Sequence, residues 1–281
     1  FVLTTSVWPE LDEEKKQAES IRKARPALEQ LSDTEIVARL RDLHPIIREF
    51  TTNQMVTATS SAIPPGMLAA VAEAIGDPTM PMRVLAGLGD VDSAAPSFAL
   101  WELSRLVRDN EDLTDAFNEG IDGLLQRIGA STSPASTQFL EKFSDFVFNY
   151  GSRGPNEWEL SAQTWETDQT IPLKTIDQVR KQSDDKNPAI GAQKSSQDRE
   201  ELVASVRSQL AELGDEELSG VFEGALVGGN QMVFRERAKT SLVRVLHESR
   251  MAIRELGRRH TNEGNIGDLE HIFMLLDEEL E

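Results

Sequence analysis

Residues Arg235 to Lys239 read Arg-Glu-Arg-Ala-Lys, a short run of alternating charge at the start of a predicted helix. A planar guanidinium at position i and a flexible ammonium at i+4 can together hold a phosphoryl group or a carboxylate. Glu236 between them could orient both cations or act as a base. We therefore take Arg235, Glu236 and Lys239 as candidate catalytic residues. The same spacing also fits an intrahelical ion network of Glu236 with Arg235 or Lys239.

The positive charge of this stretch is a local exception. Eight basic residues face three acidic ones between Arg235 and Arg259, whereas the whole chain of 281 residues carries a net charge of −19. An acidic surface repels phosphate backbones and anionic lipids. We therefore expect no nucleic-acid partner and no membrane partner, and any anion site must be local. No run approaches the roughly 18 consecutive apolar residues of a membrane helix.

A second group of chemically capable residues follows an apolar helical stretch that ends near Tyr150. Glycines at 151 and 154 permit a tight turn that exposes backbone N–H groups. The turn and the residues after it supply a hydroxyl, a cation, a carboxylate and a stacking surface, which suits a ligand loop. The substrate-binding candidates are Ser152, Arg153, Glu157 and Trp158. The alternative is a helix-ending turn in which Trp158 and Trp165 are buried anchors.

Metal chemistry is not expected. The chain has no cysteine, and its four histidines have no HxxxH or HExxH spacing, so a zinc site is not predicted. Each histidine is interpreted as a surface or capping residue. The absence of cysteine also fits a reducing compartment, and we expect a cytoplasmic protein.

These residues must be positioned by helices, because apolar residues recur at helical periodicity along most of the chain and no stretch alternates like a strand. The sequence predicts an all-α fold, a multi-helix array with a long C-terminal basic helix. Ser32 and Glu35 have the spacing of a capping box at a helix start.

On the helix predicted from Val233, one apolar stripe should be buried, with Arg235 and Lys239 at its margin. Its members are Phe234, Ala238, Leu242, Val245, Ala252, Ile253 and Leu256. The opposite face should be an ordinary charged surface exposed to solvent. That face carries Arg237, Arg244, Glu248, Glu255 and Arg259.

The best linker candidate is the polar segment 183–197, where Pro188 interrupts the helical pattern. It would separate an N-terminal helical array, residues 1–182, from a C-terminal helical hairpin region, residues 198–281, that carries the Arg-Glu-x-x-Lys motif. One domain or two closely packed helical subdomains fit this pattern.

At these same stretches the chain resembles the central helical, acceptor-binding domain of phosphoenolpyruvate-utilising, dikinase-like phosphotransferases. This group includes phosphoenolpyruvate synthase-like and rifampicin phosphotransferase-like proteins. The resemblance covers most of the chain. It rests on residues 85–89 (Leu-Ala-Gly-Leu-Gly), residues 92–96 (Asp-Ser-Ala-Ala-Pro), residues 150–161, Arg235-Glu236 with Lys239, and residues 255–259.

The resemblance implies a domain that receives a phosphoryl group from a phosphohistidine domain, which an ATP-grasp domain phosphorylates with ATP and Mg²⁺. It implies that Arg235, Glu236 and Lys239 line the phosphoryl and acceptor site, and that the chain binds a small-molecule acceptor but no cofactor of its own. Without the other domains, in cis or in trans, the chain is not expected to be active. The alternative is a non-catalytic helical scaffold or small-ligand binding module derived from that family. Because the chain begins with Phe1, we also expect that it is a piece of a longer protein.

Overall fold

The structure, a computed structural model, describes residues 8–88, 92–275 and 279. The described residues form α-helices and short 3-10 helices and contain no strand, so the predicted all-α class is confirmed. Gly89 of the resemblance motif lies outside the described residues. Contacts divide the chain into two units, which interleave along the sequence. The first unit comprises residues 60–153 and 164–233, and the second comprises residues 7–59, 154–163 and 234–281, in each case as far as they are described.

One core of the first unit lies among five consecutive helices. They are α5 (Ala95–Arg108), α6 (Glu111–Asn118), α7 (Leu124–Ala130), α8 (Pro134–Tyr150) and α9 (Thr170–Arg180). Phenylalanines at helical spacing along α8, Phe139, Phe143 and Phe146, are buried in this core. Trp165 stacks on Phe146 with ring centroids 5.5 Å apart. The aromatic face of α8 is thus held in this core, and the helix ends at Tyr150, directly before the turn at Gly151 that precedes residues 154–163.

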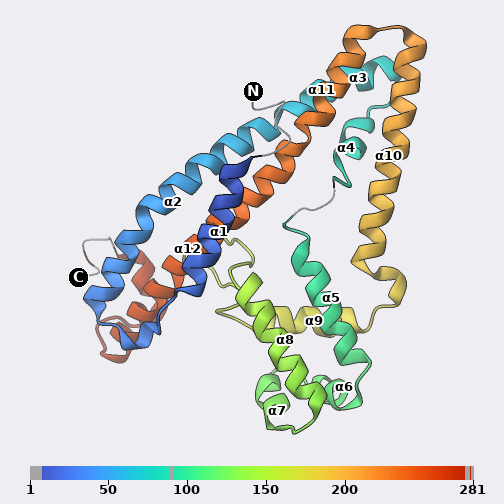
Figure 1. The fold of residues 1–281 in the computed structure, drawn as a ribbon. Coiled ribbons are helices and arrows are strands. Elements are labelled where there is room, and N and C mark those ends of the chain that lie inside the picture. The colour runs from blue at the N-terminus through green and yellow to red at the C-terminus, as the bar shows by residue number, and fades with distance from the viewer. Residues whose placement is uncertain (1–7, 89–91, 276–278, 280–281) are drawn as a thin grey trace. The chain divides into compact units, whose positions relative to one another are not determined.

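The other core of the first unit lies among four helices. They are α3 (Ile63–Ile75), α4 (Met80–Leu85), α10 (Pro188–Leu213) and α11 (Glu216–Gly228). α3 packs along α11 (Figure 1). Gly87, in the resemblance motif after α4, has a φ of +65°, and a Cβ there would lie 2.4 Å from the carbonyl oxygen of Ser195. Only glycine lets this turn lie against the backbone of α10.

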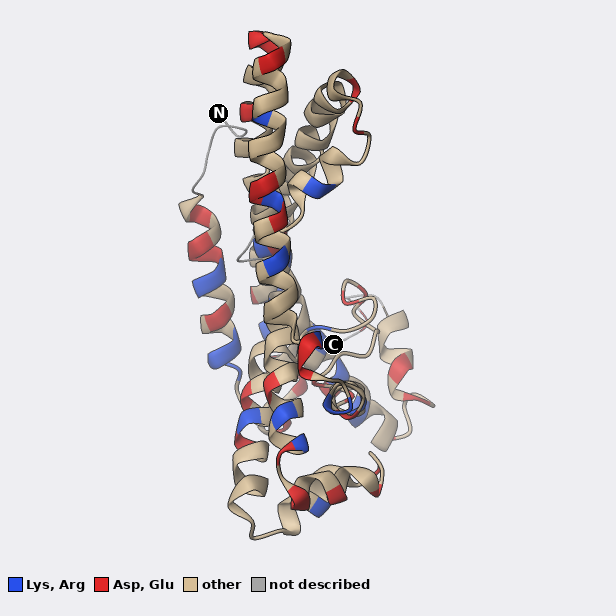
Figure 2. Cartoon of the chain, turned by 90° about the vertical axis from the view of Figure 1, so that its right-hand side faces the viewer, with Lys and Arg blue, Asp and Glu red and all other residues tan. Residues whose placement is uncertain are grey.

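The second unit is built on the long helix α12 (Asn230–Asn262), against which α1 (Pro9–Lys23) and α2 (Asp33–Ser61) pack (Figure 1). Two 3-10 helices, η2 (Leu28–Gln30) and η4 (Leu269–Met274), complete it. Figure 2 shows acidic and basic residues interleaved along α1. The predicted apolar stripe of α12 is confirmed. Phe234, Ala238, Leu242, Val245, Ala252 and Leu256 are buried, and Ile253 packs against the core that contains Ala252 and Leu256.

Helix starts follow local hydrogen bonding. The backbone N–H of Ser32 donates to Glu35 Oε2 at 2.7 Å, and that of Glu35 donates to Ser32 Oγ at 3.3 Å. The predicted capping box is therefore present at the start of α2.

The sequence predicts that Pro188 interrupts a helical pattern, but in the structure it starts a helix. α10 begins at Pro188, so residues 188–197 are helical, with η3 (Asp184–Lys186) before them. Proline at the first helical position loses no hydrogen bond, so it starts this helix instead of ending one.

One stretch, Asp33–Ile75, is long and apolar enough to cross a membrane by length and composition alone. This is weak evidence, since helices that line a protein core pass the same test. The apolar residues of its second half, Leu68, Val71 and Ala72, are buried in the core of the first unit.

Candidate functional site

The loop of residues 154–163 brings three of the predicted site residues together within the second unit. Lys239 Nζ on α12 lies 2.9 Å from Glu157 Oε1. The Glu157 side chain is 6% exposed and that of Lys239 is 25% exposed, so the ion pair is largely shielded from water. Lys239 Nζ also lies 6.0 Å from the centre of the Trp158 ring, at the limit of a cation–π interaction. Trp158 itself is 43% exposed. The ammonium of Lys239, the carboxylate of Glu157 and the accessible indole of Trp158 therefore lie close together.

Backbone geometry is restricted both at the turn before the loop and within the loop. A Cβ at Gly151 would lie 2.3 Å from the carbonyl oxygen of Val147, so this position accepts only glycine. The left-handed conformation of the loop is at Asn156, with a φ of +57°. Asparagine tolerates this conformation better than most residues. The backbone N–H of Glu159 donates to Asn156 O at 3.0 Å, and that of Gly154 donates to Glu157 Oε2 at 3.4 Å.

Arg235 and Glu236 form a pair of their own. Arg235 Nη2 donates to Glu236 Oε1 at 2.9 Å and Nε donates to the same oxygen at 3.2 Å. Of the two intrahelical pairings considered from the sequence, Glu236 makes the one with Arg235, while Lys239 pairs with Glu157 on the loop. Both cations are therefore already engaged by carboxylates. An incoming anion would have to replace Glu157 or Glu236, or add to them.

Arg250, which the sequence analysis did not select, anchors the loop to α12. Arg250 is 0% exposed. Nε donates to Leu160 O at 3.0 Å, and Nη2 donates to Glu157 O at 2.9 Å and Glu159 O at 2.8 Å. Burial, with the nearby charge of Arg254, lowers the pKa of Arg250 to about 10. The guanidinium is thus still charged at neutral pH.

His247, one helical turn before Arg250, corrects another prediction. The sequence predicts a surface or capping residue, but His247 is 1% exposed. Arg250 Nη1 lies 3.1 Å from His247 Nδ1. Because an arginine can only donate, Nδ1 is the acceptor and the imidazole proton is on Nε2. His247 is therefore a neutral partner of the buried arginine in this arrangement.

The charged face of α12 is not the solvent-exposed surface that the sequence predicted. Glu248 is 1% exposed. It accepts from Arg25 at 2.7 and 2.8 Å and from Arg39 at 3.3 Å, and Arg22 lies 3.6 Å away. The remaining arginines of this face pair with acids of α1 or α2. These pairs are Arg237 with Asp12, Arg244 with Glu19 and Arg259 with Asp33. Because α1 and α2 pack against this face, their carboxylates neutralise much of its charge.

Two of the substrate-binding candidates, Ser152 and Arg153, belong to the first unit. Ser152 is buried at 7% exposure, and the backbone carbonyl of Arg153 accepts from Trp165 N at 2.8 Å. The anchor interpretation fits Trp165, which packs in the first core, and is wrong for Trp158, which is exposed.

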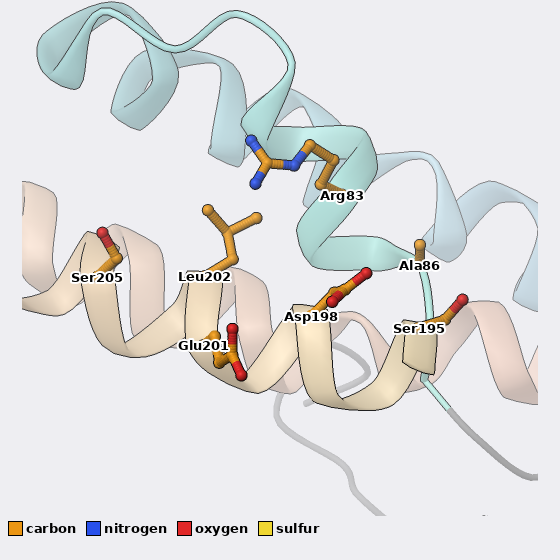
Figure 3. A pocket seen from close by; sticks show the side chains of 7 residues that line it. All are labelled: Arg83, Ala86, Ser195, Asp198, Glu201, Leu202 and Ser205. Carbon is orange, nitrogen blue, oxygen red and sulfur yellow. The ribbon is translucent and has the colours of Figure 1, made fainter. Parts of the chain in front are cut away.

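A cavity of about 430 Å³ lies in the first unit, between α4 and α10 (Figure 3). None of the predicted site residues lines it. Figure 3 shows Arg83 of α4 on one side, with Asp198, Glu201 and Ser205 of α10 on the other. Arg83 Nη1 already pairs with Asp77 at 3.1 Å. The mixed charge of the lining indicates no particular ligand.

The comparisons with known proteins agree with the resemblance seen in the sequence. The family described as "Rifampicin phosphotransferase fourth domain" matches residues 53–226, which is more than half of the chain. The search of curated proteins gave no match. The matched range includes the whole 154–163 loop but ends before Arg235, so the family match does not reach the Arg-Glu-x-x-Lys residues. On the matched range, the chain belongs to the family of the rifampicin phosphotransferase fourth domain.

Proposed function

We propose that this chain is the acceptor-binding helical domain of a dikinase-like phosphotransferase and receives a phosphoryl group from a phosphohistidine on another domain. Family membership supports a phosphotransferase-related role. The observation that carries the proposal is the loop held on α12, which gathers Glu157, Trp158 and Lys239 in one place. Cations that stabilise the transferring oxygens, and a base near the acceptor hydroxyl, are what phosphoryl transfer requires of such a site.

In this proposal each candidate has a defined role. Lys239 and Arg235 hold the phosphoryl oxygens. Glu236 orients these two cations or accepts the proton of the acceptor hydroxyl. Trp158 offers a face for an apolar or aromatic part of the acceptor, and Glu157 holds Lys239 until the anion arrives. Ser152 and Arg153 stay predictions for acceptor binding. A small molecule with a hydroxyl group is the acceptor class that these residue types fit.

ATP and Mg²⁺ belong to the donor half of the proposed enzyme, the ATP-grasp and phosphohistidine domains, in cis or in trans. Among the described residues, no group of three or more His, Cys, Asp or Glu side chains could hold a metal ion. We assign these residues no step that involves a metal ion. The proposed setting is the cytoplasm.

The roles of Arg235 and Lys239 can be tested by substitution in the complete enzyme, with its donor domains attached or supplied. Arg235→Ala and Lys239→Ala should each reduce phosphoryl transfer by roughly 10²-fold or more while the fold is retained, because each removes a cation from the transferring oxygens. Transfer from ATP to the acceptor is the readout, with circular dichroism as the check on folding. The control is Arg258→Ala, since Arg258 is half exposed and pairs with Glu255. An Arg235→Ala enzyme with wild-type activity would exclude the assigned role.

The mass of the native gene product would say how the donor domains are supplied. A species much heavier than 31.2 kDa, detected in the source cells with an antibody to this region, would place them on the same chain. A species near 31.2 kDa would require separate partners.

The second candidate function is a non-catalytic scaffold or ligand-binding module. The observation that favours it is the pairing of the α12 cations with carboxylates of α1, α2 and the loop, which is what a helix needs for packing alone. If both Ala variants transfer phosphoryl groups as fast as the wild type, this second function is the one to pursue.

A further inference from the structure

Arg250 has an unusual environment for a charged side chain. It is the largest of the side chains that are fully buried among the described residues. Within the described part of the chain, its hydrogen bonds go to three main-chain carbonyls and to His247, and none goes to a carboxylate. A buried cation that no carboxylate hydrogen-bonds is costly, and an apolar side chain of similar volume would avoid that cost. What an apolar side chain could not do is hold three carbonyl groups at once.

The three carbonyls belong to the loop that carries two of the candidate site residues. Residues 154–163 form no regular helix, so their backbone polar groups need partners elsewhere. Arg250 supplies them at residues 157, 159 and 160 with the fixed fork of one guanidinium. The first of these is the carbonyl of Glu157, whose carboxylate makes the ion pair with Lys239.

α12 thus contacts Glu157 twice. Lys239 and Arg250 are about three helical turns apart and so lie on nearly the same side of the helix. Lys239 meets the side chain of Glu157 and Arg250 meets its backbone. A rigid helix that holds the backbone of a residue also limits where that residue's carboxylate can reach. This is the relation expected of a supporting residue behind a binding site.

We propose that Arg250 is a positioning residue, which fixes the loop of residues 154–163 on α12 and thereby sets the Glu157–Lys239 pair and the exposed face of Trp158. The claim that this pair binds an acceptor rests on the proposed function. The claim that Arg250 positions the pair does not depend on that function.

The test compares this chain with Arg250→Lys, which keeps the charge but loses the fork. The control is Arg237→Lys on the same helix, which changes a cation paired with Asp12. The first readout is acylation of Lys239 by an amine-selective reagent, followed by mass spectrometry. We expect Lys239 to react about 5-fold faster in Arg250→Lys and at the wild-type rate in the control, as expected when a partly shielded ion pair is loosened. The second readout is peptide-level hydrogen exchange, which should accelerate over residues 154–163 and not over α8.

Repeating the Arg250→Lys substitution in a Glu157→Gln protein distinguishes positioning of Glu157 from a purely structural role of Arg250. In Glu157→Gln, Lys239 has already lost its carboxylate, so adding Arg250→Lys should change the acylation rate by less than about 2-fold. An equal increase in both backgrounds would show that Arg250 does not act through Glu157. Unchanged acylation and exchange in a folded Arg250→Lys protein would overturn the proposal.

A measurement on the wild-type protein keeps the proposal testable if Arg250→Lys does not fold. The Nε–H of Arg250 should exchange with solvent at least about 10-fold more slowly than that of half-exposed Arg258, since it is buried and donates to Leu160 O. Equal exchange rates would overturn the proposal. If Lys239 responds to Arg250→Lys while transfer by the complete enzyme does not, the positioning holds and the proposed function fails.

Discussion

At the scale of single residues, buried charges in the second unit differ in how they are compensated. Glu248 is surrounded by three arginines, and Arg250 is satisfied by carbonyls. Glu14 of α1 has less support. It is 4% exposed, and among the described residues only its Oε1 finds a hydrogen-bond donor, Asn53. Burial raises the pKa of Glu14 above its usual 4.5, and the charge of Glu49 adds to the effect, while the Asn53 bond opposes it.

We therefore predict that Glu14→Gln stabilises the protein at neutral pH. The raised pKa means that protonated Glu14 favours the folded state, and this contribution is lost as pH rises from below 4.5 through the folded pKa. A neutral glutamine keeps the acceptor for Asn53 and removes the buried charge. Thermal unfolding should give a higher Tm for Glu14→Gln than for wild type at pH 7, with the difference shrinking below pH 4.5.

Glu13→Gln is the matched control, because Glu13 is an exposed neighbour paired with Lys16. It should change the Tm little at either pH. A Glu14→Gln protein with a lower Tm at pH 7 would show that the buried charge is compensated in a way that this arrangement does not include.

At the scale of elements, the site depends on helix ends and on turns that lie against neighbouring helices. The turn that precedes the loop begins where α8 ends, at Gly151, where an added Cβ would clash with the carbonyl of Val147. The turn after α4 follows the same principle at Gly87, against the backbone of α10. Both glycines lie in stretches on which the family resemblance rests, and close approach of the backbone is the physical reason for each.

Gly87→Ala should destabilise the first unit by roughly 2–4 kcal/mol, because a left-handed backbone and a clash with Ser195 O must both be relieved. Gly191→Ala on α10 is the contrasting change. Its Cβ would meet nothing within 4 Å, and alanine should stabilise the helix by about 0.5–1 kcal/mol. Urea denaturation followed by circular dichroism measures both. A Gly87→Ala midpoint equal to that of wild type would contradict the packing described for this turn.

At the scale of the whole molecule, the family match and the candidate site cover different parts of the chain. The match lies mostly in the first unit and takes only the loop and a few residues of α2 from the second. The proposed catalytic residues on α12 lie beyond it.

Both units also depend on ionised carboxylates. Hydrogen bonds from Arg258, with those from Arg259, lower the pKa of Glu255 despite its burial. Burial raises the pKa of Asp177, but hydrogen bonds from Lys181 and Arg180 outweigh it and the net pKa is lowered.

Acid should therefore unfold both units at low pH. A carboxyl with a depressed folded pKa stabilises the fold above its unfolded pKa and loses that contribution as pH falls through the folded value. For Asp177 and Glu255 the folded values lie below 3.8 and 4.5. We expect the helical signal in far-UV circular dichroism to persist at pH 5 and to fall only below these values. Loss of most helix at pH 5 would show that other groups dominate the acid transition.

The sequence was sufficient for features that depend on neighbouring residues. Helical periodicity predicted an all-α fold and the buried stripe of α12, and the spacing of Ser32 and Glu35 predicted the start of α2. Such features involve hydrogen bonds and side chains within one or two turns. The same local reasoning misread Pro188, because proline interrupts a helix from within but fits well at its first position.

The tertiary structure decided which charges are buried and which carboxylate meets which cation. One apolar stripe predicts that only one face of a helix is buried. α12 is instead covered by α1, α2 and the loop, so Glu248, His247 and Arg250 are buried as well. The run Ser241-Leu242-Val243, small or apolar on more than one side of the helix, was the signal for this burial. The Glu157–Lys239 pair joins residues far apart in the chain. Only the folding of the loop onto α12 brings them together, because no local periodicity relates two such distant positions.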